Sequence, residues 1–121
     1  MLVVDDQPDV ARVLKMVLEI DGFQVQLAGS GKEALALFEP QKFAFIFTDF
    51  AMPEMNGHEL ASIIKGRDAH QPIIMVTAYA QSVPIGDSLP QVDVVIGKPW
   101  SRDELREALN KAALTALLPK R

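Results

Sequence analysis

The feature that most constrains the fold of this chain is the regular alternation of two hydrophobic patterns. Short apolar runs of strand length recur along the sequence, and stretches with apolar residues at the spacing of a helix lie between them. Strands that alternate with amphipathic helices are typical of a parallel β-sheet covered by helices on both faces. The alternation therefore predicts an α/β fold.

Residues that favour helix starts and ends divide the chain at the same places. Pro8 opens the first helical stretch, and Asp21-Gly22 ends it. Three further helices are predicted to begin at capping pairs, in which Glu follows Ser or Asn by three residues: Ser30–Glu33, Asn56–Glu59 and Ser101–Glu104. The predicted strands are residues 1–4, 23–27, 43–49, 72–78 and 92–98.

The strand sequences also predict the order of the strands. The first, third and fourth runs are continuously apolar, as central strands buried on both faces are. Residues 23–27 alternate between apolar and polar, and residues 92–98 partly do, as edge strands would. With right-handed crossovers this predicts a flavodoxin-like, doubly wound, five-stranded parallel sheet in the order 2-1-3-4-5, with flanking helices.

The segment before the fifth strand interrupts the pattern. Pro84, Gly86 and Pro90 lie where the fourth helix is expected. Proline in a helix interior costs about 3 kcal/mol and glycine about 1 kcal/mol, so this helix is expected to be short or irregular.

Length and composition narrow the class of protein. The 121 residues are expected to form one domain, residues 1–121, and no apolar stretch is long enough for membrane insertion. The absence of cysteine excludes disulfides, thiolate metal sites and thiol catalysis, and suits a cytoplasmic location. A net charge of −4 without a basic cluster argues against direct nucleic-acid binding.

Polar side chains stand where four of the predicted strands end. These residues are Asp5 and Asp6, Asp49, Thr77 and Lys98. In open α/β sheets the functional site lies beyond the carboxyl ends of the strands, so these groups are expected to share one crevice. Clustered carboxylates with room for water suit Mg²⁺. An aspartate beside Mg²⁺, a lysine and a threonine can attack a phosphoryl group.

Four short motifs then give the chain a family resemblance. They are VVDD at 3–6, D-x-x-M-P-x-M-N-G at 49–57, VTA at 76–78 and KP at 98–99. Each is weak alone, but in this order at these strand ends they are specific. Over nearly its whole length the chain resembles the CheY-like receiver domain of two-component response regulators.

The resemblance implies a magnesium site and a phosphoryl site. Asp6 would bind Mg²⁺ directly and Asp5 mostly through water, with Asp49 and the backbone carbonyl of Ala51 as further ligands. Asp49 would be the phosphoacceptor, and the family's site also has a hydroxyl and a lysine for the phosphoryl oxygens. Those two groups would be Thr77 and Lys98, with a cis peptide between Lys98 and Pro99.

The function implied is a step in a phosphorelay. A histidine kinase or a phosphotransfer domain would donate its phosphoryl group to Asp49 with Mg²⁺ present, and the phosphorylated domain would switch an output domain or a downstream protein. Slow autodephosphorylation would end the signal, so the chain would be a signalling phosphoacceptor rather than a metabolic enzyme. Because Met1 stands almost at the first strand, the sequence favours a receiver taken from a longer protein.

One departure keeps an alternative open. Receivers usually carry Tyr or Phe three residues before the lysine, where the ring moves inward on activation, but here that residue is Val95; Tyr79 is the nearest aromatic residue in the sequence. A pseudo-receiver that acts as an interaction module without phosphorylation therefore remains an alternative. An FMN carrier would need a Ser/Thr/Gly-rich loop after the first strand, and a haloacid-dehalogenase-like phosphatase would need D-x-D and a cap domain; the sequence has neither.

Overall fold

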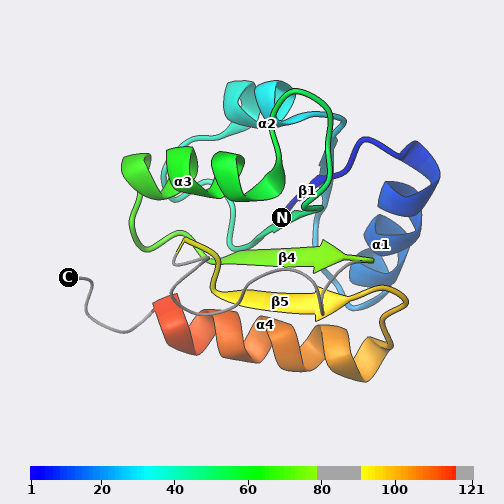
Figure 1. Cartoon of the computed structure of the whole chain (residues 1–121). Helices are drawn as coiled ribbons and strands as arrows, with labels where there is room; N and C mark the ends of the chain where they lie inside the picture. Colours follow the sequence, from blue (N-terminus) through cyan, green and yellow to red (C-terminus); the bar gives the residue numbers. More distant parts are fainter. Residues whose placement is uncertain (79–90, 117–121) are drawn as a thin grey trace.

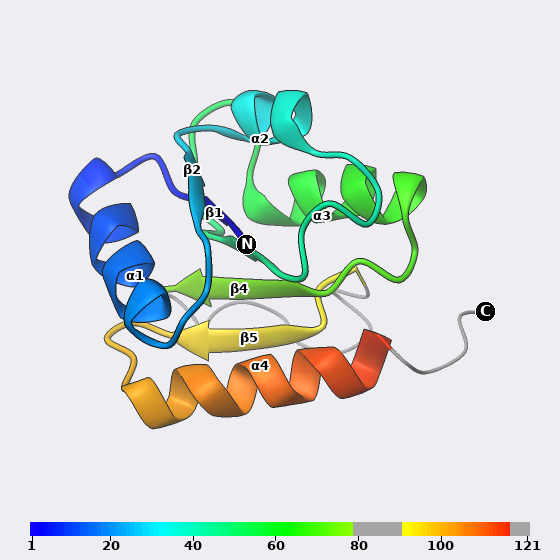
Figure 2. The ribbon, with the colours of Figure 1, turned by 180° about the vertical axis from the view of Figure 1, so that it is seen from behind.

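The chain folds into the α/β architecture that the alternation predicts (Figures 1 and 2). A computed structural model describes residues 1–78 and 91–116. In these residues the strands are β1 (Leu2–Val4), β2 (Gln26–Ala28), β3 (Ile46–Thr48), β4 (Ile73–Thr77) and β5 (Val94–Gly97). The helices are α1 (Pro8–Ile20), α2 (Gly31–Leu37), α3 (Gly57–Arg67) and α4 (Arg102–Ala116).

All five strands form one parallel sheet in the order β2-β1-β3-β4-β5, which confirms the predicted order. Every residue of β1, β3 and β4 is buried, whereas β5 is half-buried and β2 runs from exposed to buried. The continuously apolar runs are therefore the central strands, and the fold is the flavodoxin-like, doubly wound type.

Successive residues of a central strand point to opposite faces and build two separate core layers. Leu2, Val4 and Ile46 pack against the buried faces of α2 and α3. Val3 and Phe47 pack against α1 and α4. Figures 1 and 2 show the same division, with α2 and α3 on one side of the sheet and α1 and α4 on the other.

The strands are shorter than the apolar runs that predicted them. The ladder of β1 holds only Leu2–Val4, and it pairs with Gln26–Ala28 on one side and Ile46–Thr48 on the other. The run at 43–49 therefore contributes only Ile46–Thr48, and the run at 23–27 contributes only Gln26 and Leu27. Strand β2 continues to Ala28, one residue beyond the predicted end. The other apolar residues of these runs lie outside the strands. Phe23, Val25 and Phe45 among them still pack against the core layer under α1 and α4.

The predicted helix starts are confirmed by their capping bonds. Asn56 and Glu59 form a full capping box at α3, and Ser101 and Glu104 exchange the same two bonds at α4. At α2 the Ser30 side chain accepts from the Glu33 N–H. These bonds satisfy N–H groups that have no partner within the helix.

Two predictions concern residues that the structure does not describe. The short or irregular helix expected before the fifth strand, which is not α4, falls within residues 79–90. The aromatic residue Tyr79 does too, and these residues lie outside the described part of the chain. Among residues 1–78 and 91–116, no helix combines the length and the apolar character needed to cross a bilayer.

Candidate functional site

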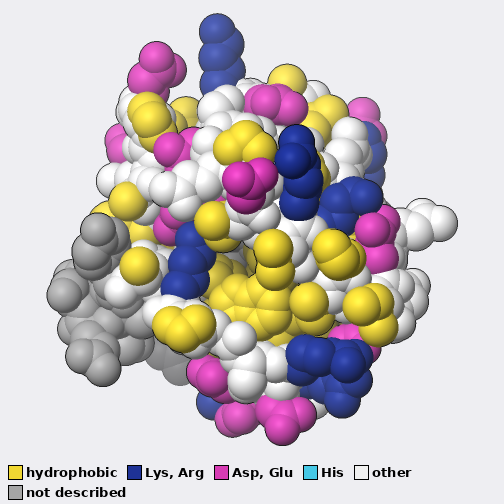
Figure 3. Space-filling model, turned by 90° about the vertical axis from the view of Figure 1, so that its right-hand side faces the viewer, with side chains coloured by type: hydrophobic (Ala, Val, Ile, Leu, Met, Phe, Trp, Pro, Cys, Tyr) yellow, Lys and Arg dark blue, Asp and Glu magenta, His cyan; other side chains and the backbone are white. Residues whose placement is uncertain are grey.

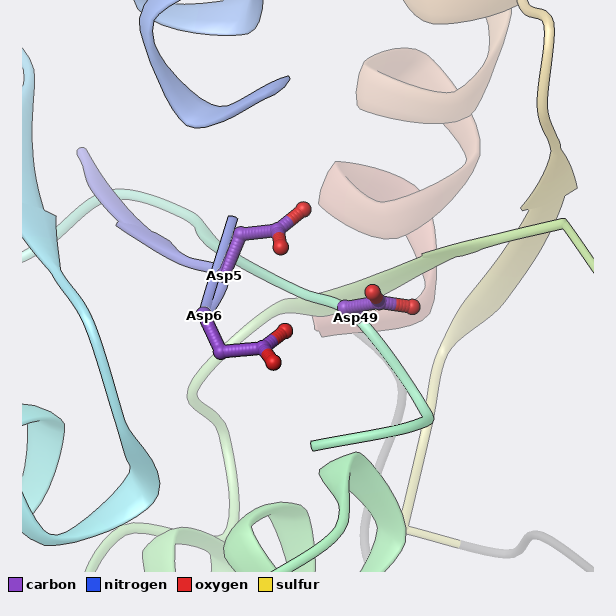
Figure 4. Close-up of side chains that lie close together, drawn as sticks. All are labelled: Asp5, Asp6 and Asp49. Atoms are coloured by element: carbon purple, nitrogen blue, oxygen red, sulfur yellow. The ribbon is translucent and has the colours of Figure 1, made fainter. Parts of the chain in front are cut away.

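Two neighbouring strands bring three carboxylates together. Asp5 and Asp6 follow β1, Asp49 follows β3, and the two strands are paired up to Val4 and Thr48. The Asp49 N–H donates to the Val4 carbonyl at 3.0 Å, so the pairing extends to the strand ends. One carboxylate oxygen from each aspartate lies within 4.8 Å of the others. Figure 4 shows Asp5 and Asp6 extending from the end of β1 toward the side where Asp49 lies.

The ammonium group of Lys98 reaches this cluster from β5, with β4 between. Its Nζ lies 3.3 Å from Asp5 Oδ2 and 3.4 Å from Asp49 Oδ2. The backbone of Lys98 is held by its N–H, which donates to the Thr77 carbonyl at 2.9 Å. The Lys98-Pro99 peptide is cis, as the resemblance implies.

Among residues 1–78 and 91–116, the charges of the cluster do not cancel, because three carboxylates lie near one ammonium group. Burial raises the pKa of Asp49 above its ordinary value; the Lys98 charge lowers it, and the Asp5 carboxylate raises it. The Asp49 side chain is only 11% exposed, so little solvent screens this repulsion. A divalent cation among the oxygens would offset the excess charge, and an all-oxygen donor set is the kind that Mg²⁺ prefers. The residues present therefore fit the expected metal.

The loop after Asp49 leaves a carbonyl group for that metal. The Asp49 carbonyl accepts from the Thr48 hydroxyl at 2.9 Å, and the Phe50 carbonyl accepts from the Gly57 N–H at 2.8 Å. Ala51 is exposed, and no hydrogen bond to its carbonyl is found among the described residues. It is the first carbonyl of the loop that internal bonds do not occupy, which suits its expected role as a ligand.

Thr77 lies at the same edge of the sheet. It is the last residue of β4, two positions beyond Met75, which pairs with Thr48 of β3. Its side chain is fully buried. The structure thus brings Asp5 and Asp49 into ion-pair distance of Lys98 and places a carboxylate oxygen of Asp6 within 4.8 Å of the other two carboxylates. Thr77 lies at the neighbouring strand end.

A small cavity lies against the inner side of the cluster. Its volume is about 10 Å³, and its polar lining comes from Asp5, Thr48, Asp49 and Lys98, with Trp100 among the apolar residues. A cavity of this size has room for about one water molecule, not for a phosphoryl group. This cavity is therefore too small for such a group, whereas Asp6 of the same cluster is exposed to solvent.

The position at which an aromatic residue was expected has a different environment. Val95 is half-buried, and it packs with Phe50 and Val92 against the buried Met75. In the part of the chain that the structure describes, Phe50 is the aromatic residue that packs against Met75 in this hydrophobic group. Sequence reasoning gave Phe50 no role; the signal that could have singled it out is its place directly after Asp49.

Comparison with known proteins agrees with this fold and shows the family. Residues 1–110 match the response regulator receiver domain family. The regulatory protein AtoC of Escherichia coli (strain K12) is 33% identical over 113 residues, which are 92% of this chain and 24% of AtoC. The transcriptional regulatory protein SrrA of Staphylococcus aureus (strain NCTC 8325 / PS 47) is 34% identical over 105 residues, 86% of this chain and 43% of SrrA. The chain therefore spans less than half the length of either relative.

Solved structures show the same likeness. The response regulator TrrA of Thermotoga maritima, in complex with Mg²⁺ and BeF, has a TM-score of 0.83 and 32% identity, covering 92% of this chain and 96% of TrrA. TrrA in a complex with the histidine kinase ThkA has a TM-score of 0.81 at 32% identity, covering 92% of this chain and 95% of the matched one. The doubly wound sheet in the order β2-β1-β3-β4-β5 is the fold that the chain shares with these response regulator structures. This chain belongs to the response regulator receiver domain family.

Proposed function

We propose that this chain is a Mg²⁺-dependent phosphoacceptor, in which Asp49 receives the phosphoryl group of a phosphohistidine on a histidine kinase or a phosphotransfer domain. The observation that carries the proposal is the cluster of Asp5, Asp6 and Asp49 with Lys98 beside it. Such a set combines a nucleophile, oxygen ligands for a cation and a group that can bind the transferred phosphoryl oxygens.

The transfer is a substitution at phosphorus. An ionised oxygen of Asp49 forms the new P–O bond while the P–N bond to the donor imidazole breaks, and the electron pair of that bond stays on the ring nitrogen. Water later attacks the acyl phosphate, breaks its P–O bond to the carboxylate and releases inorganic phosphate. This slow autodephosphorylation makes the domain a timed signal rather than a metabolic enzyme.

The remaining site residues bind charge during this step. Lys98 Nζ, which contacts Asp5 and Asp49 in the structure, would pair with a phosphoryl oxygen, and the Thr77 hydroxyl would donate to another. Mg²⁺ would supply positive charge at the same oxygens. It would be held by the carboxylates and by the backbone carbonyl of Ala51.

One face of the molecule supports docking of the phosphodonor. On α1, Val13, Met16 and Ile20 are 53%, 60% and 68% exposed, and their spacing places them on one side of the helix. Figure 3 shows hydrophobic side chains gathered on the face that carries α1 and the carboxyl ends of β4 and β5. Because α1 begins two residues after Asp6, a donor bound to this apolar stripe would lie beside the cluster.

The output of the domain follows from the same proposal. Phosphorylation would change the conformation of the receiver and thereby control an output domain or a downstream protein in the cytoplasm. The similar proteins AtoC and SrrA are regulators, which supports this role.

Labelling by a small phosphodonor tests the function. Wild-type protein with Mg²⁺ and acetyl phosphate should gain one acid-labile, hydroxylamine-sensitive phosphoryl group, seen as a mass increase. Asp49→Asn should not be labelled, because an amide is not a nucleophile, whereas Asp103→Asn, at an exposed acid of α4, should be labelled normally. An unlabelled wild type would favour the pseudo-receiver instead, and a labelled Asp49→Asn protein would exclude Asp49 as the acceptor.

A further inference from the structure

Thr48 is a polar residue at a buried position of the central strand β3. It is the last residue of β3, its side chain is 1% exposed, and its neighbours in the ladder are Val4 and Met75. A buried hydroxyl costs free energy unless it is hydrogen-bonded, and valine has nearly the same shape. The hydrogen-bond partner of this hydroxyl therefore indicates what threonine provides that valine would not.

The hydroxyl of Thr48 binds the peptide group that follows Asp49. Its Oγ1 donates to the Asp49 carbonyl oxygen at 2.9 Å. The other end of this same peptide group is the Phe50 N–H, which donates to Asp49 Oδ1 at 2.7 Å. One peptide plane is thus bound at one end by Thr48 and at the other end binds the carboxylate.

Because a peptide group is planar, holding its carbonyl oxygen also fixes the direction of its N–H. The threonine side chain is suited to this, since its branched Cβ restricts χ1. The same carbonyl is also close to Gly57, where a Cβ atom would overlap the Asp49 carbonyl oxygen. The Asp49–Phe50 peptide therefore has both a hydrogen-bond donor and a close backbone neighbour at its carbonyl oxygen.

We propose that Thr48 is a positioning residue for phosphoryl transfer, whose hydroxyl fixes the peptide that orients the Asp49 carboxylate. With Oδ1 held by the Phe50 N–H, the plane of the carboxylate is set, and Oδ2 lies 3.4 Å from Lys98 Nζ. The inference rests on the proposed function of Asp49 as the acceptor. Substitution at phosphorus needs an aligned nucleophile, and a misplacement of about 1 Å can slow a reaction on the order of 100-fold.

The test compares variants that keep or remove the donor. Thr48→Val removes the hydroxyl and keeps the shape, whereas Thr48→Ser keeps the hydroxyl and loses a methyl group. Phosphorylation by acetyl phosphate is measured at saturating Mg²⁺, with Mg²⁺ affinity followed separately through the fluorescence of Trp100, the single tryptophan of the chain. We expect Thr48→Val to lower the phosphorylation rate constant about 10-fold or more and Thr48→Ser to stay within about 3-fold of wild type.

Two further variants separate positioning from stability. Ile64 is a buried residue of α3 that is not part of the carboxylate cluster. Ile64→Val should therefore lower the stability of the protein and still be phosphorylated at the wild-type rate. Thr48→Cys matches serine in size but has a weak donor, so it should be slower than Thr48→Ser; this pair replaces the valine variant if that protein does not fold.

The outcomes distinguish this inference from the proposed function. A wild type that is not labelled at Asp49 would remove both. A labelled wild type together with Thr48→Val or Thr48→Cys reacting as fast as Thr48→Ser would overturn only the role of Thr48. Equal slowing by Ile64→Val would also overturn it, because the effect would then follow from stability alone.

Discussion

At the scale of single residues, the site depends on one missing side chain. Gly57 begins α3 and donates its N–H to the Phe50 carbonyl. A Cβ atom at this position would overlap the Asp49 carbonyl oxygen and lie 3.0 Å from its carbonyl carbon. The close approach of α3 to the backbone of Asp49 therefore requires glycine.

The consequence can be measured with two glycines of the same helix. Gly57→Ala should lower the free energy of unfolding by about 1–3 kcal/mol, because the inserted methyl group forces the backbone apart. Gly66→Ala should raise it by about 0.5–1 kcal/mol, since a Cβ there meets no atom within 4 Å and alanine favours the helix. Urea unfolding checks both, and a Gly57→Ala protein as stable as wild type would contradict the crowding argument.

At the scale of elements, a buried ion pair joins α3 to the sheet. Lys65 Nζ lies 2.9 Å from Asp93 Oδ2, and the two side chains are 8% and 5% exposed. The same carboxylate oxygen accepts from the Ile73 N–H at 2.7 Å. Asp93 thus ties the end of α3 to the starts of β4 and β5.

Removing one partner should leave a buried charge uncompensated. Lys65→Met should lower the free energy of unfolding by about 3–5 kcal/mol. The matched control is Lys111→Met on α4, where Lys111 and Glu107 are 62% and 66% exposed, and the expected loss is at most about 1 kcal/mol. Similar losses for the two variants in denaturant titrations would show that the Lys65–Asp93 pair is not specially buried in solution.

The apolar stripe of α1 leads to a second prediction for an element. Met16→Ser should slow phosphotransfer from a phosphorylated histidine kinase several-fold, because the donor protein would lose apolar contact area. Labelling by acetyl phosphate should not change, since a small donor needs no docking surface. Leu114→Ser, at a 66% exposed leucine of α4, is the control and should leave both rates unchanged. A loss of both rates in Met16→Ser would point to damage at the site instead.

At the scale of the whole molecule, an ion-pair group joins α1 to α4. Asp21 Oδ1 lies 2.7 Å from Arg102 Nη2 and 3.2 Å from Arg106 Nη2. Hydrogen bonds from Arg106 and Arg102 lower the pKa of Asp21. The unfolded chain therefore binds more protons here as the pH falls, so this stabilisation is complete above the unfolded pKa and is lost as the pH falls through the folded pKa.

Asp21→Asn should be less stable than wild type at neutral pH, and the difference between their free energies of unfolding should disappear in acid. Unfolding at a series of pH values checks this, and a difference that stays constant with pH would contradict it.

Metal binding should likewise act on the stability of the whole fold. At 100 times its dissociation constant, Mg²⁺ should raise the free energy of unfolding by about 2.7 kcal/mol. Asp6→Ala should lose most of this gain, yet be at least as stable as wild type in a chelator, because one like charge has been removed. Asp9→Ala, at an exposed acid outside the cluster, should keep the full gain. An unchanged Mg²⁺ effect in Asp6→Ala would exclude Asp6 as a ligand.

The sequence by itself was sufficient for the order of the strands, the helix starts and the residues of the cluster. These features depend on local patterns: the period of apolar residues, the capping pairs and the polar residues directly after a strand. Once the sheet is parallel, its geometry gathers the strand ends at one edge, so the sequence is enough to predict that Asp5, Asp6, Asp49 and Lys98 meet there.

Only the tertiary structure decided features that depend on partners far away in the chain. The run at 43–49 was predicted too long, and the run at 23–27 was predicted to start three residues too early and to end one residue too early. Each of these strands holds only the three residues that pair with β1. The contact of Gly57 with Asp49 and the pairing of Lys65 with Asp93 likewise join separate segments. Even the bond of Thr48 to the adjacent peptide has meaning only because burial removes water as its alternative partner.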